Sequence, residues 1–280
     1  INIVPSSERE FTHPLLSGGK FIFSSLSAAK TEFKKGYSEL FPISPRPPQN
    51  YIERIKKEIP LPEKSIKLNG ANISLTSQAI LVSPEPNIQI SITLKGTEIL
   101  LSTDAKNGSS VTLNIPDDGL VLVEGNLSIS GTIKKRLTIV SSGTIRITGD
   151  ILYLDKNDNH PFLPDFESNS SYSGDSSLAL VAVSDILYQP VLPSQSDSSG
   201  LKVCALLISL NGSIRSEMST RMAHLLIYGS RICRKRPYRL IKGTGFADAT
   251  YLLDPKLAAN PPRFAPSFSV PSILCIKVEN

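Results

Sequence analysis

Two similar stretches of nine residues, GNLSISGTI (residues 125–133) and GTIRITGDI (residues 143–151), decide the fold class of this chain. They align without a gap at an offset of 18 residues. Apolar pairs superpose and polar pairs lie between them: Leu127/Ile145, Ile129/Ile147 and Ile133/Ile151, with Ser128/Arg146 and Ser130/Thr148. This alternation predicts strands with one buried and one solvated face, and a fixed offset is typical of repeat architectures.

A coil of about 18 residues cannot bury its inner face alone, whereas stacked coils let equivalent isoleucines pack on one another. The repeat therefore predicts an all-β fold, a right-handed parallel β-helix (solenoid) that runs from Ile66 to Ile232. Gly131 and Gly149 are expected at equivalent bends, where a positive φ is needed. A β-sandwich is the alternative, because its short strands also recur at regular spacing, but sandwiches do not usually repeat inner and outer positions in register.

The coils are expected to continue irregularly beyond the repeat. Leu180 would occupy the position of Ile139, and Ile186 that of Ile145. Two insertions, residues 154–177 and 189–200, interrupt the pattern. Loops of this kind usually leave a solenoid at one corner and carry its contacts with partners.

The division of the chain follows from where the strand pattern begins. Residues 1–65 are predicted to be an irregular N-terminal segment with one short strand at residues 21–23. Residues 66–280 are predicted to form the parallel β-helix with a C-terminal tail that wraps back along it. Pro261 and Pro262 would end strand pairing, because proline has no backbone N–H, and residues 272–280 would form a last strand at a free edge.

One short helix is predicted before the solenoid, within YIERIKKEIP (residues 51–60). Ile52, Ile55 and Ile59 fall on one face at helical spacing. Asn50 with Glu53 resembles a capping box at its start. We expect this helix to cover the open end of the solenoid.

Composition narrows the classes of protein. A hydrophobic content of 40% with 20% charged residues is enough for a core and too apolar for disorder, and the net charge of +5 does not argue for nucleic acid. The chain has no run of 18 apolar residues that would span a membrane. Cys204, Cys233 and Cys275 match no zinc or redox spacing, so we expect buried structural thiols, with a Cys204–Cys233 disulfide as the alternative.

Residue types that carry chemistry are sparse. The histidines, His13, His160 and His224, lie far apart, and no local motif suggests a nucleophile–histidine–acid set. Asp155, Asn157 and Asn159 alternate as in a calcium loop, but His160 stands where glycine is expected and no glutamate follows at the bidentate position. A solvated loop is therefore favoured over a calcium site.

A dense basic run, RICRKRPYRLIK (residues 231–242), is the strongest charge feature. Its cations are Arg231, Arg234, Lys235, Arg236, Arg239 and Lys242. They indicate either a patch for anionic lipid, glycan or nucleic acid, or a charged edge that blocks end-to-end strand pairing. The second interpretation is favoured.

From residue 119 onward the chain resembles an uncharacterised bacterial envelope family of pilus-assembly or minor-pilin-like proteins with a domain of unknown function. The resemblance rests on LVLVEGNLSISGTIKKRLTIVSSGTIRITGDILY, LALVAVSDILY, ALLISLNGSI, LLIYGSRICRKR and, most specifically, YLLDPKLAANPPRFAP (residues 251–266). It implies an exported β-helical body, a membrane helix upstream of Ile1 and a place in the cell envelope, periplasmic or extracellular. It implies no known activity and no catalytic residues.

We therefore expect a non-enzymatic, exported cell-envelope protein, a structural, adhesive or pilus-associated module whose loops bind a protein or glycan partner at the cell surface. No catalytic, cofactor-binding or metal-binding residue is predicted, and no cofactor or nucleic-acid partner. The alternative is a carbohydrate-active β-helix enzyme, which would need carboxylates converging on one face. A scaffold that polymerises end to end is a third option.

Overall fold

The computed structural model describes residues 2–3, 22–23, 50–162, 169–190, 200–218, 221–235 and 245–266. The chain divides into two compact units, residues 52–265 and residues 1–51 with 266–280. In the second unit, the described strands β1 (Asn2–Ile3) and β2 (Ile22–Phe23) pair in parallel. The strand predicted at residues 21–23 is thus confirmed, and the last strand predicted at 272–280 lies outside the described residues.

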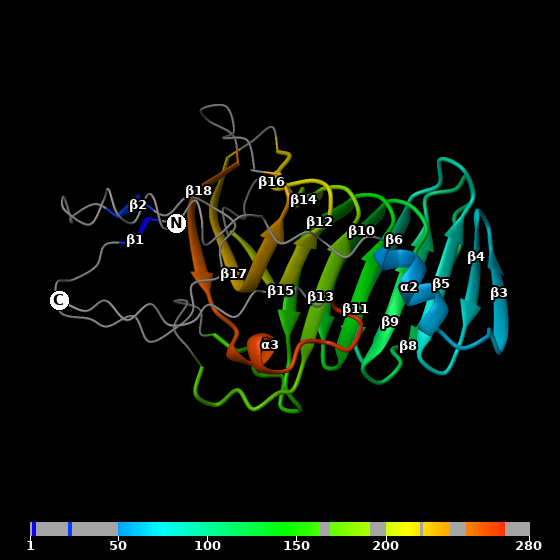
Figure 1. Ribbon diagram of the computed structural model, residues 1–280, viewed down its shortest axis with the longest axis horizontal. Coiled ribbons are helices and arrows are strands. Elements are labelled where there is room, and N and C mark those ends of the chain that lie inside the picture. Colours follow the sequence, from blue (N-terminus) through cyan, green and yellow to red (C-terminus); the bar gives the residue numbers. More distant parts are fainter. Residues whose placement is uncertain are drawn as a thin grey trace. The chain divides into compact units, whose positions relative to one another are not determined.

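The larger unit is built on strands. Strands make up 54% and helices 6%, so the predicted all-β class is confirmed. Its described strands join in one mixed, 16-stranded sheet (Figure 1). They are β3 (Lys64–Leu68), β4 (Ala71–Leu75), β5 (Ala79–Pro84), β6 (Ile90–Gly96), β7 (Glu98–Thr103), β8 (Ser110–Asn114), β9 (Gly119–Val123), β10 (Leu127–Ile133), β11 (Arg136–Ser141), β12 (Ile145–Tyr153), β13 (Ser177–Ala182), β14 (Ile186–Tyr188), β15 (Leu201–Ser209), β16 (Ile214–Ser216), β17 (Arg221–Cys233) and β18 (Gly245–Leu252).

Two rows of parallel strands make up most of this sheet. One row runs β5, β9, β11, β13, β15, β17 and β18, and the other runs β6, β10, β12, β14 and β16. Leu180 pairs with Ile139, and Ile186 pairs with Ile145. Both predicted correspondences across the insertion at residues 154–177 are therefore confirmed.

The nine-residue repeat holds in register for only half its length. Leu127 pairs with Ile145 and Ile129 with Ile147, as predicted, but Gly131 then pairs with Ile151. The predicted pairing of Ile133 with Ile151 and the shared bend of Gly131 and Gly149 are wrong. A bulge is the reason, because residues 148–150 of β12 lie opposite Ser130 alone. At Gly131, φ is 113°, and a Cβ atom would overlap the carbonyl oxygen of Leu94.

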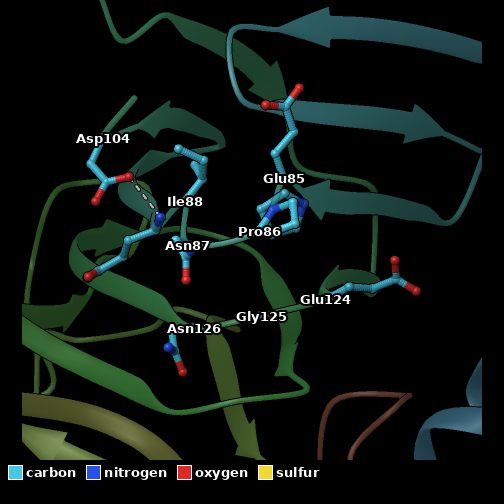
Figure 2. Close-up of a pocket in the computed structure, with 10 residues that line it drawn as sticks. Glu85, Pro86, Asn87, Ile88, Asp104, Glu124, Gly125 and Asn126 are labelled. Atoms are coloured by element: carbon cyan, nitrogen blue, oxygen red, sulfur yellow. Dashed lines mark hydrogen bonds between the residues drawn. The ribbon is translucent and has the colours of Figure 1, made fainter. Parts of the chain in front are cut away.

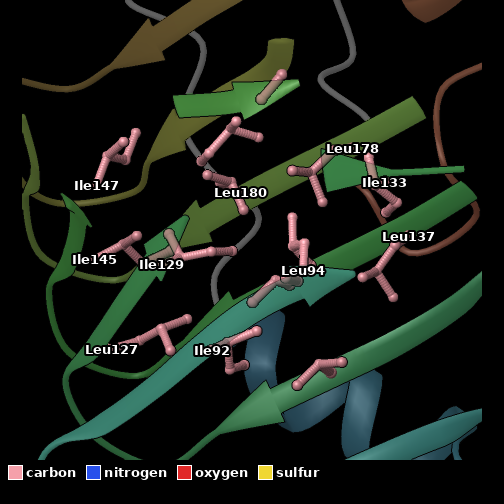
Figure 3. Close-up of a cluster of buried hydrophobic side chains, with 14 of the residues drawn as sticks. Ile92, Leu94, Leu127, Ile129, Ile133, Leu137, Ile145, Ile147, Leu178 and Leu180 are labelled. Atoms are coloured by element: carbon pink, nitrogen blue, oxygen red, sulfur yellow. The ribbon is translucent and has the colours of Figure 1, made fainter. Parts of the chain in front are cut away.

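The inward side chains of neighbouring strands stack in columns (Figure 3). One column, whose members are at most 2% exposed, consists of Ile90, Leu127, Ile145, Ile186 and Ile214. Full burial of an aliphatic side chain contributes about 1.5–3 kcal/mol. These columns therefore supply much of the free energy that holds the rows together.

Residues 64–114 depart from the predicted parallel arrangement. Here β3, β4 and β5 pair antiparallel, and so do β6, β7 and β8. Asn69 and Gly70 alone connect β3 to β4, and Gly70 has a φ of 83°. Gly96, with a φ of 66°, and Thr97 likewise lie between the paired residues Lys95 and Glu98. Turns this short can join only antiparallel strands, because a parallel connection needs about a dozen residues.

Helix α2 (Tyr51–Glu58) confirms the short helix predicted before the strands. Ile55 is buried, and Lys56 pairs with Glu124, which directly follows β9. The helix therefore contacts the sheet near β9, three strands in from the edge strand β3 (Figure 1). It does not cover the open end of the sheet, where it was expected. The predicted capping box starts at Asn50, but Asn50 has a φ of 63°, whereas an N-cap residue is normally extended. Asn50 therefore lacks the backbone conformation that a capping box needs.

After β18 the chain turns back across the sheet through helix α3 (Pro255–Ala259), whose N-cap is Asp254. Arg136 of β11 donates from Nη2 to Asn260 Oδ1 (3.0 Å) and to the carbonyl of Pro261 (2.9 Å). The backbone N–H of Arg263 donates to Asp118 Oδ1 (3.1 Å). Hydrogen bonds therefore hold residues 260–263 against the starts of β9 and β11.

Candidate binding site

The turns between the two parallel rows stack on one another and carry the polar groups of one face. Asn126 Oδ1 accepts from the N–H of Thr144 in the next turn (2.9 Å). Asp185 Oδ1 accepts in the same way from the N–H of Ser213 (2.7 Å). Gly143 is needed because a Cβ there would lie 2.5 Å from Asn126 Oδ1. Side-chain hydrogen bonds therefore link successive turns of this stack.

Burial would raise the pKa of Asp185, but hydrogen bonds from the N–H and hydroxyl of Ser213, together with Arg215, outweigh it and lower the pKa. Arg215 Nη2 lies 3.4 Å from Asp185 Oδ2 and 3.7 Å from Glu217 Oε1. Arg215, on β16, is thus paired with two carboxylates, one from the turn before β14 and one directly after β16.

A first hollow of about 490 Å³ opens beside these turns, and we call it the acidic hollow (Figure 2). It is lined by residues 84–89 together with Asp104, Glu124, Gly125 and Asn126. Asp104 Oδ1 accepts from the backbone N–H of Gln89 (2.8 Å). Figure 2 shows the carboxylates of Glu85, Asp104 and Glu124 pointing in different directions.

Glu124 is already paired within the protein. It accepts from Lys56 and, at 2.6 Å, from the hydroxyl of Ser83. The hydrogen bond from Lys56, followed by that from Ser83, lowers the pKa of Glu124. Glu124 is therefore held as a carboxylate that anchors α2, and is poorly placed to act as a general acid.

A second hollow, of about 430 Å³, shares Gln89 with the first, and we call it the arginine hollow. Its lining comprises Gln89, Ser128, Arg146, Thr148, Gln189 and Pro190. These residues lie on or beside four neighbouring strands, β6, β10, β12 and β14. Three spacings between strands make a distance of about 14 Å. The hollow is thus a polar groove that crosses the outward side of the second row.

Hydrogen bonds order the walls of the arginine hollow. Gln89 donates from Nε2 to Ser128 Oγ, which is buried beneath it. The hydroxyl of Thr148 donates to the carbonyl of Ile129 (3.3 Å) at the bulge. Arg146 is half-buried between these groups, and no carboxylate of the described residues pairs with it.

The predicted calcium-like loop is organised by protein hydrogen bonds around one carboxylate. Asp155 is 3% exposed. Its Oδ1 accepts from the N–H groups of Asn157 (2.8 Å) and Asn159 (2.9 Å), and its Oδ2 accepts from Asn159 Nδ2 (3.1 Å) and from the N–H of Ser173 (3.2 Å). Burial would raise the pKa of Asp155, but these donors, those of Asn159 first, lower it to about 2. These donors occupy both carboxylate oxygens that a cation would need. Asp155 therefore holds the loop together through hydrogen bonds within the protein.

The two described histidines lie in separate surroundings. His160 Nδ1 lies 3.0 Å from the carbonyl of Tyr153, and its ring stacks on Phe162. His224 Nδ1 lies 3.5 Å from Asp248 Oδ2. His13 lies outside the described residues. Among the described residues, no group of three or more His, Cys, Asp or Glu side chains is placed to hold a metal ion.

The basic run is described only as far as Lys235. The guanidinium of Arg231 lies 4.3 Å from the centre of the Tyr251 ring, and Arg234 Nη1 donates to Asn211 Oδ1 (3.2 Å). The backbone N–H of Lys235 donates to the carbonyl of Gly212 (2.8 Å). Arg236, Arg239 and Lys242 lie outside the described residues.

Cys204 and Cys233 are free thiols, so the alternative of a disulfide between them is wrong. Cys204 is fully buried, as predicted, and burial raises the pKa of its thiol well above the usual range. Cys233 is only partly buried, and Cys275 lies outside the described residues. A thiol that holds its proton as tightly as Cys204 is a poor nucleophile.

The arginine hollow is the site that the sequence pattern did not indicate. The sequence predicts that the repeat is core and that the insertions carry the contacts, yet Ser128, Arg146 and Thr148 all belong to the repeat. Gln189 and Pro190 begin the second predicted loop, and residues 191–199 lie outside the described residues. The one signal in the sequence was Arg146 itself, a long cation where the first copy of the repeat has Ser128.

No helix of the described residues is long and apolar enough to cross a membrane. Comparisons of the chain with family models, with curated proteins and with solved structures found no significant match.

Proposed function

We propose that this chain is a non-enzymatic, exported module of the bacterial cell envelope, structural, adhesive or pilus-associated, that binds a protein or glycan partner at the cell surface. We also propose that its strands form a right-handed parallel β-helix. The parallel pairing of β10 with β12 and of β11 with β13 supports this architecture. The resemblance of residues 119–266 to envelope proteins supports the location.

The observation that carries the binding role is the pair of polar hollows that share Gln89 beside the second row of strands. Their linings are rich in amide, hydroxyl and carboxylate groups, which suit the hydrogen-bonding groups of a polar partner. Hydrogen bonds within the protein already orient Asp104, Gln89 and Thr148, which lowers the entropy lost on binding.

Two measurements test this proposal together. Antibody labelling of intact cells should find the protein at the surface, and the purified chain should retain a partner on a glycan array or from a surface extract. Protein found only in the cytosolic fraction would contradict the envelope location. The absence of any retained glycan or protein would contradict the binding role.

A second candidate, a carbohydrate-active enzyme, is favoured by one observation: three carboxylates line the acidic hollow. Their different directions and the pairing of Glu124 with Lys56 argue against a cooperating acid and base. The appearance of new reducing ends when the purified chain is incubated with polysaccharides would favour the enzyme, provided that Glu85→Gln or Asp104→Asn abolishes it.

A further inference from the structure

We propose that the arginine hollow binds the carboxylate of an acidic sugar, and that Arg146 selects a uronate-containing polysaccharide over a neutral one. This inference rests on the proposed binding function and names its ligand class. It is carried by a comparison of two arginines that lie in the same outward column of the sheet.

The column runs across five paired strands: Ser91, Ser128, Arg146, Leu187 and Arg215. Arg215 is neutralised by Asp185 and Glu217. Arg146 has no carboxylate partner among the described residues, although it is half-buried. A partly desolvated guanidinium without a counter-charge attracts an anion, because its charge is poorly screened there.

The neighbours of Arg146 indicate which anion fits. Thr148, Gln89 and Gln189 add one hydroxyl and two amide groups, and these can exchange hydrogen bonds with sugar hydroxyls. The planar fork of the guanidinium matches a carboxylate through two parallel hydrogen bonds. The groove therefore offers one anion contact flanked by neutral polar contacts.

The charge count argues against phosphate-rich polymers. Among the described residues that line the arginine hollow, Arg146 is the only cation, whereas strong binding to a polyphosphate or nucleic acid requires several cations along the chain. A uronate polysaccharide carries one carboxylate on each acidic sugar among neutral hydroxyl groups, so the single guanidinium of Arg146 can be matched by a single sugar.

The experiment compares affinities of the full chain for polygalacturonate, dextran and polyphosphate by affinity electrophoresis at two salt concentrations. We expect polygalacturonate to bind most tightly and less tightly at the higher salt. Arg146→Gln should weaken this binding by about 10- to 100-fold, the usual worth of hydrogen bonds to a charged group. Arg146→Lys should weaken it less, because the charge remains without the fork.

Arg215→Gln is the matched control, because it removes a cation from the same column that is already paired. It should leave the affinity for polygalacturonate unchanged. Thermal unfolding of each variant shows whether it is folded, and if Arg146→Gln is not, Arg146→Lys provides the comparison.

Several outcomes would overturn the inference. One is an Arg146 variant that binds polygalacturonate as tightly as the wild type. Another is tighter binding of polyphosphate than of polygalacturonate, which would exclude a carboxylate as the preferred ligand of Arg146. Equal binding of dextran would remove the acid selectivity but leave the proposed binding function standing. Failure of the wild type to bind any of these polymers would remove the inference, whereas surface labelling and protein capture test the proposed function separately.

Discussion

Residues 64–114 and residues 119–252 are both series of short apolar strands, yet the strands of the first region pair antiparallel with one another and those of the second pair in parallel with one another. The difference lies in the connections. Two residues link β3 to β4, so the chain must reverse at once. The paired residues Leu127 and Ile145 are 18 residues apart, so strand β11 and the turns on either side of it intervene before β10 and β12 meet. Turn length therefore decides strand direction where composition does not.

The two regions also differ in how many residues of each strand are buried. The outer strands β3 and β8 each bury one residue of five, whereas β9 and β13 are buried at every position. A strand buried on both faces is typical of parallel sheets that other elements cover. The parallel rows thus form the core of the larger unit, and the antiparallel strands extend it.

The largest expected effect tests this difference in burial. Ile145→Ala removes a fully buried side chain from the middle of an inward column and should destabilise the fold by about 2–5 kcal/mol. Ile66→Ala in the edge strand β3 should cost about 1 kcal/mol, because that side chain is only partly buried. Urea unfolding of both variants measures the difference, and equal losses would contradict the assignment of the core.

A second pair of variants tests the glycines of the two regions. Gly131→Ala should cost about 2–3 kcal/mol, because its φ of 113° is unfavourable for alanine and its Cβ would overlap the backbone of Leu94. Gly70→Ala, at a φ of 83°, meets only side-chain atoms at 3.1 Å, so about 1 kcal/mol is expected. Thermal unfolding of the two proteins compares them. A more harmful Gly70→Ala would contradict the close approach of Gly131 to the backbone of Leu94.

A third test uses two buried carboxylates beside the parallel rows whose pKa values shift in opposite directions. Asp155 has a pKa of about 2, below its unfolded value of about 3.9. The Asp155 carboxylate therefore stabilises the fold fully above about pH 3.9, and this contribution is lost as the pH falls through about 2. Burial, which outweighs hydrogen bonds from Lys256 and Leu257, raises the pKa of Asp254. Its contribution is present below about 3.9 and is lost as the pH rises through the folded pKa.

The difference in melting temperature between wild type and variant, followed against pH, separates the two carboxylates. Asp155→Asn should be most harmful near neutral pH and less harmful in acid. Asp254→Asn keeps an oxygen that can cap α3. Its melting temperature relative to that of the wild type should rise with pH, because asparagine cannot ionise. The same pH trend for both variants would refute the opposite shifts.

The smallest effect is expected where α2 meets the junction of the two regions. Lys56 and Glu124 form an ion pair whose side chains are 42% and 41% exposed. Lys56→Met should therefore cost less than about 1 kcal/mol, and the loss should shrink in high salt. Chemical unfolding at low and high salt measures it. A large, salt-independent loss would mean that α2 depends on more than this pair.

Strand direction was predictable from the sequence only in part. The offset of 18 residues correctly paired Leu127 with Ile145, and the recurring apolar alternation extended that register across the insertion to Leu180 and Ile186. The bulge at residues 148–150 was not predictable, because the second copy of the repeat continues without a gap. The Asn-Gly pair at residues 69–70 is a hairpin signal that an interpretation based on the repeat alone passes over.

The candidate site was less predictable than the fold. Gln89 and Arg146 are far apart in the sequence, and only the pairing of β6, β10 and β12 brings them to one groove. Asp155 is a different case, because its spacing with Asn157 and Asn159 is visible in the sequence, but the solvated loop that was favoured there is wrong at Asp155, which is buried. The spacing did not reveal that backbone N–H groups would occupy the carboxylate.

Cross-linking tests the register of the parallel rows directly. Ser128 and Arg146 are directly paired on neighbouring strands, and strands about 4.8 Å apart bring their Cα atoms within disulfide range. The double variant Ser128→Cys/Arg146→Cys should therefore form a disulfide under mild oxidation. Ser128→Cys/Arg215→Cys, in the same column but about 14 Å apart, should not. Peptide mapping identifies the linked cysteines, and cross-linking of the second pair without the first would contradict the stacked parallel arrangement.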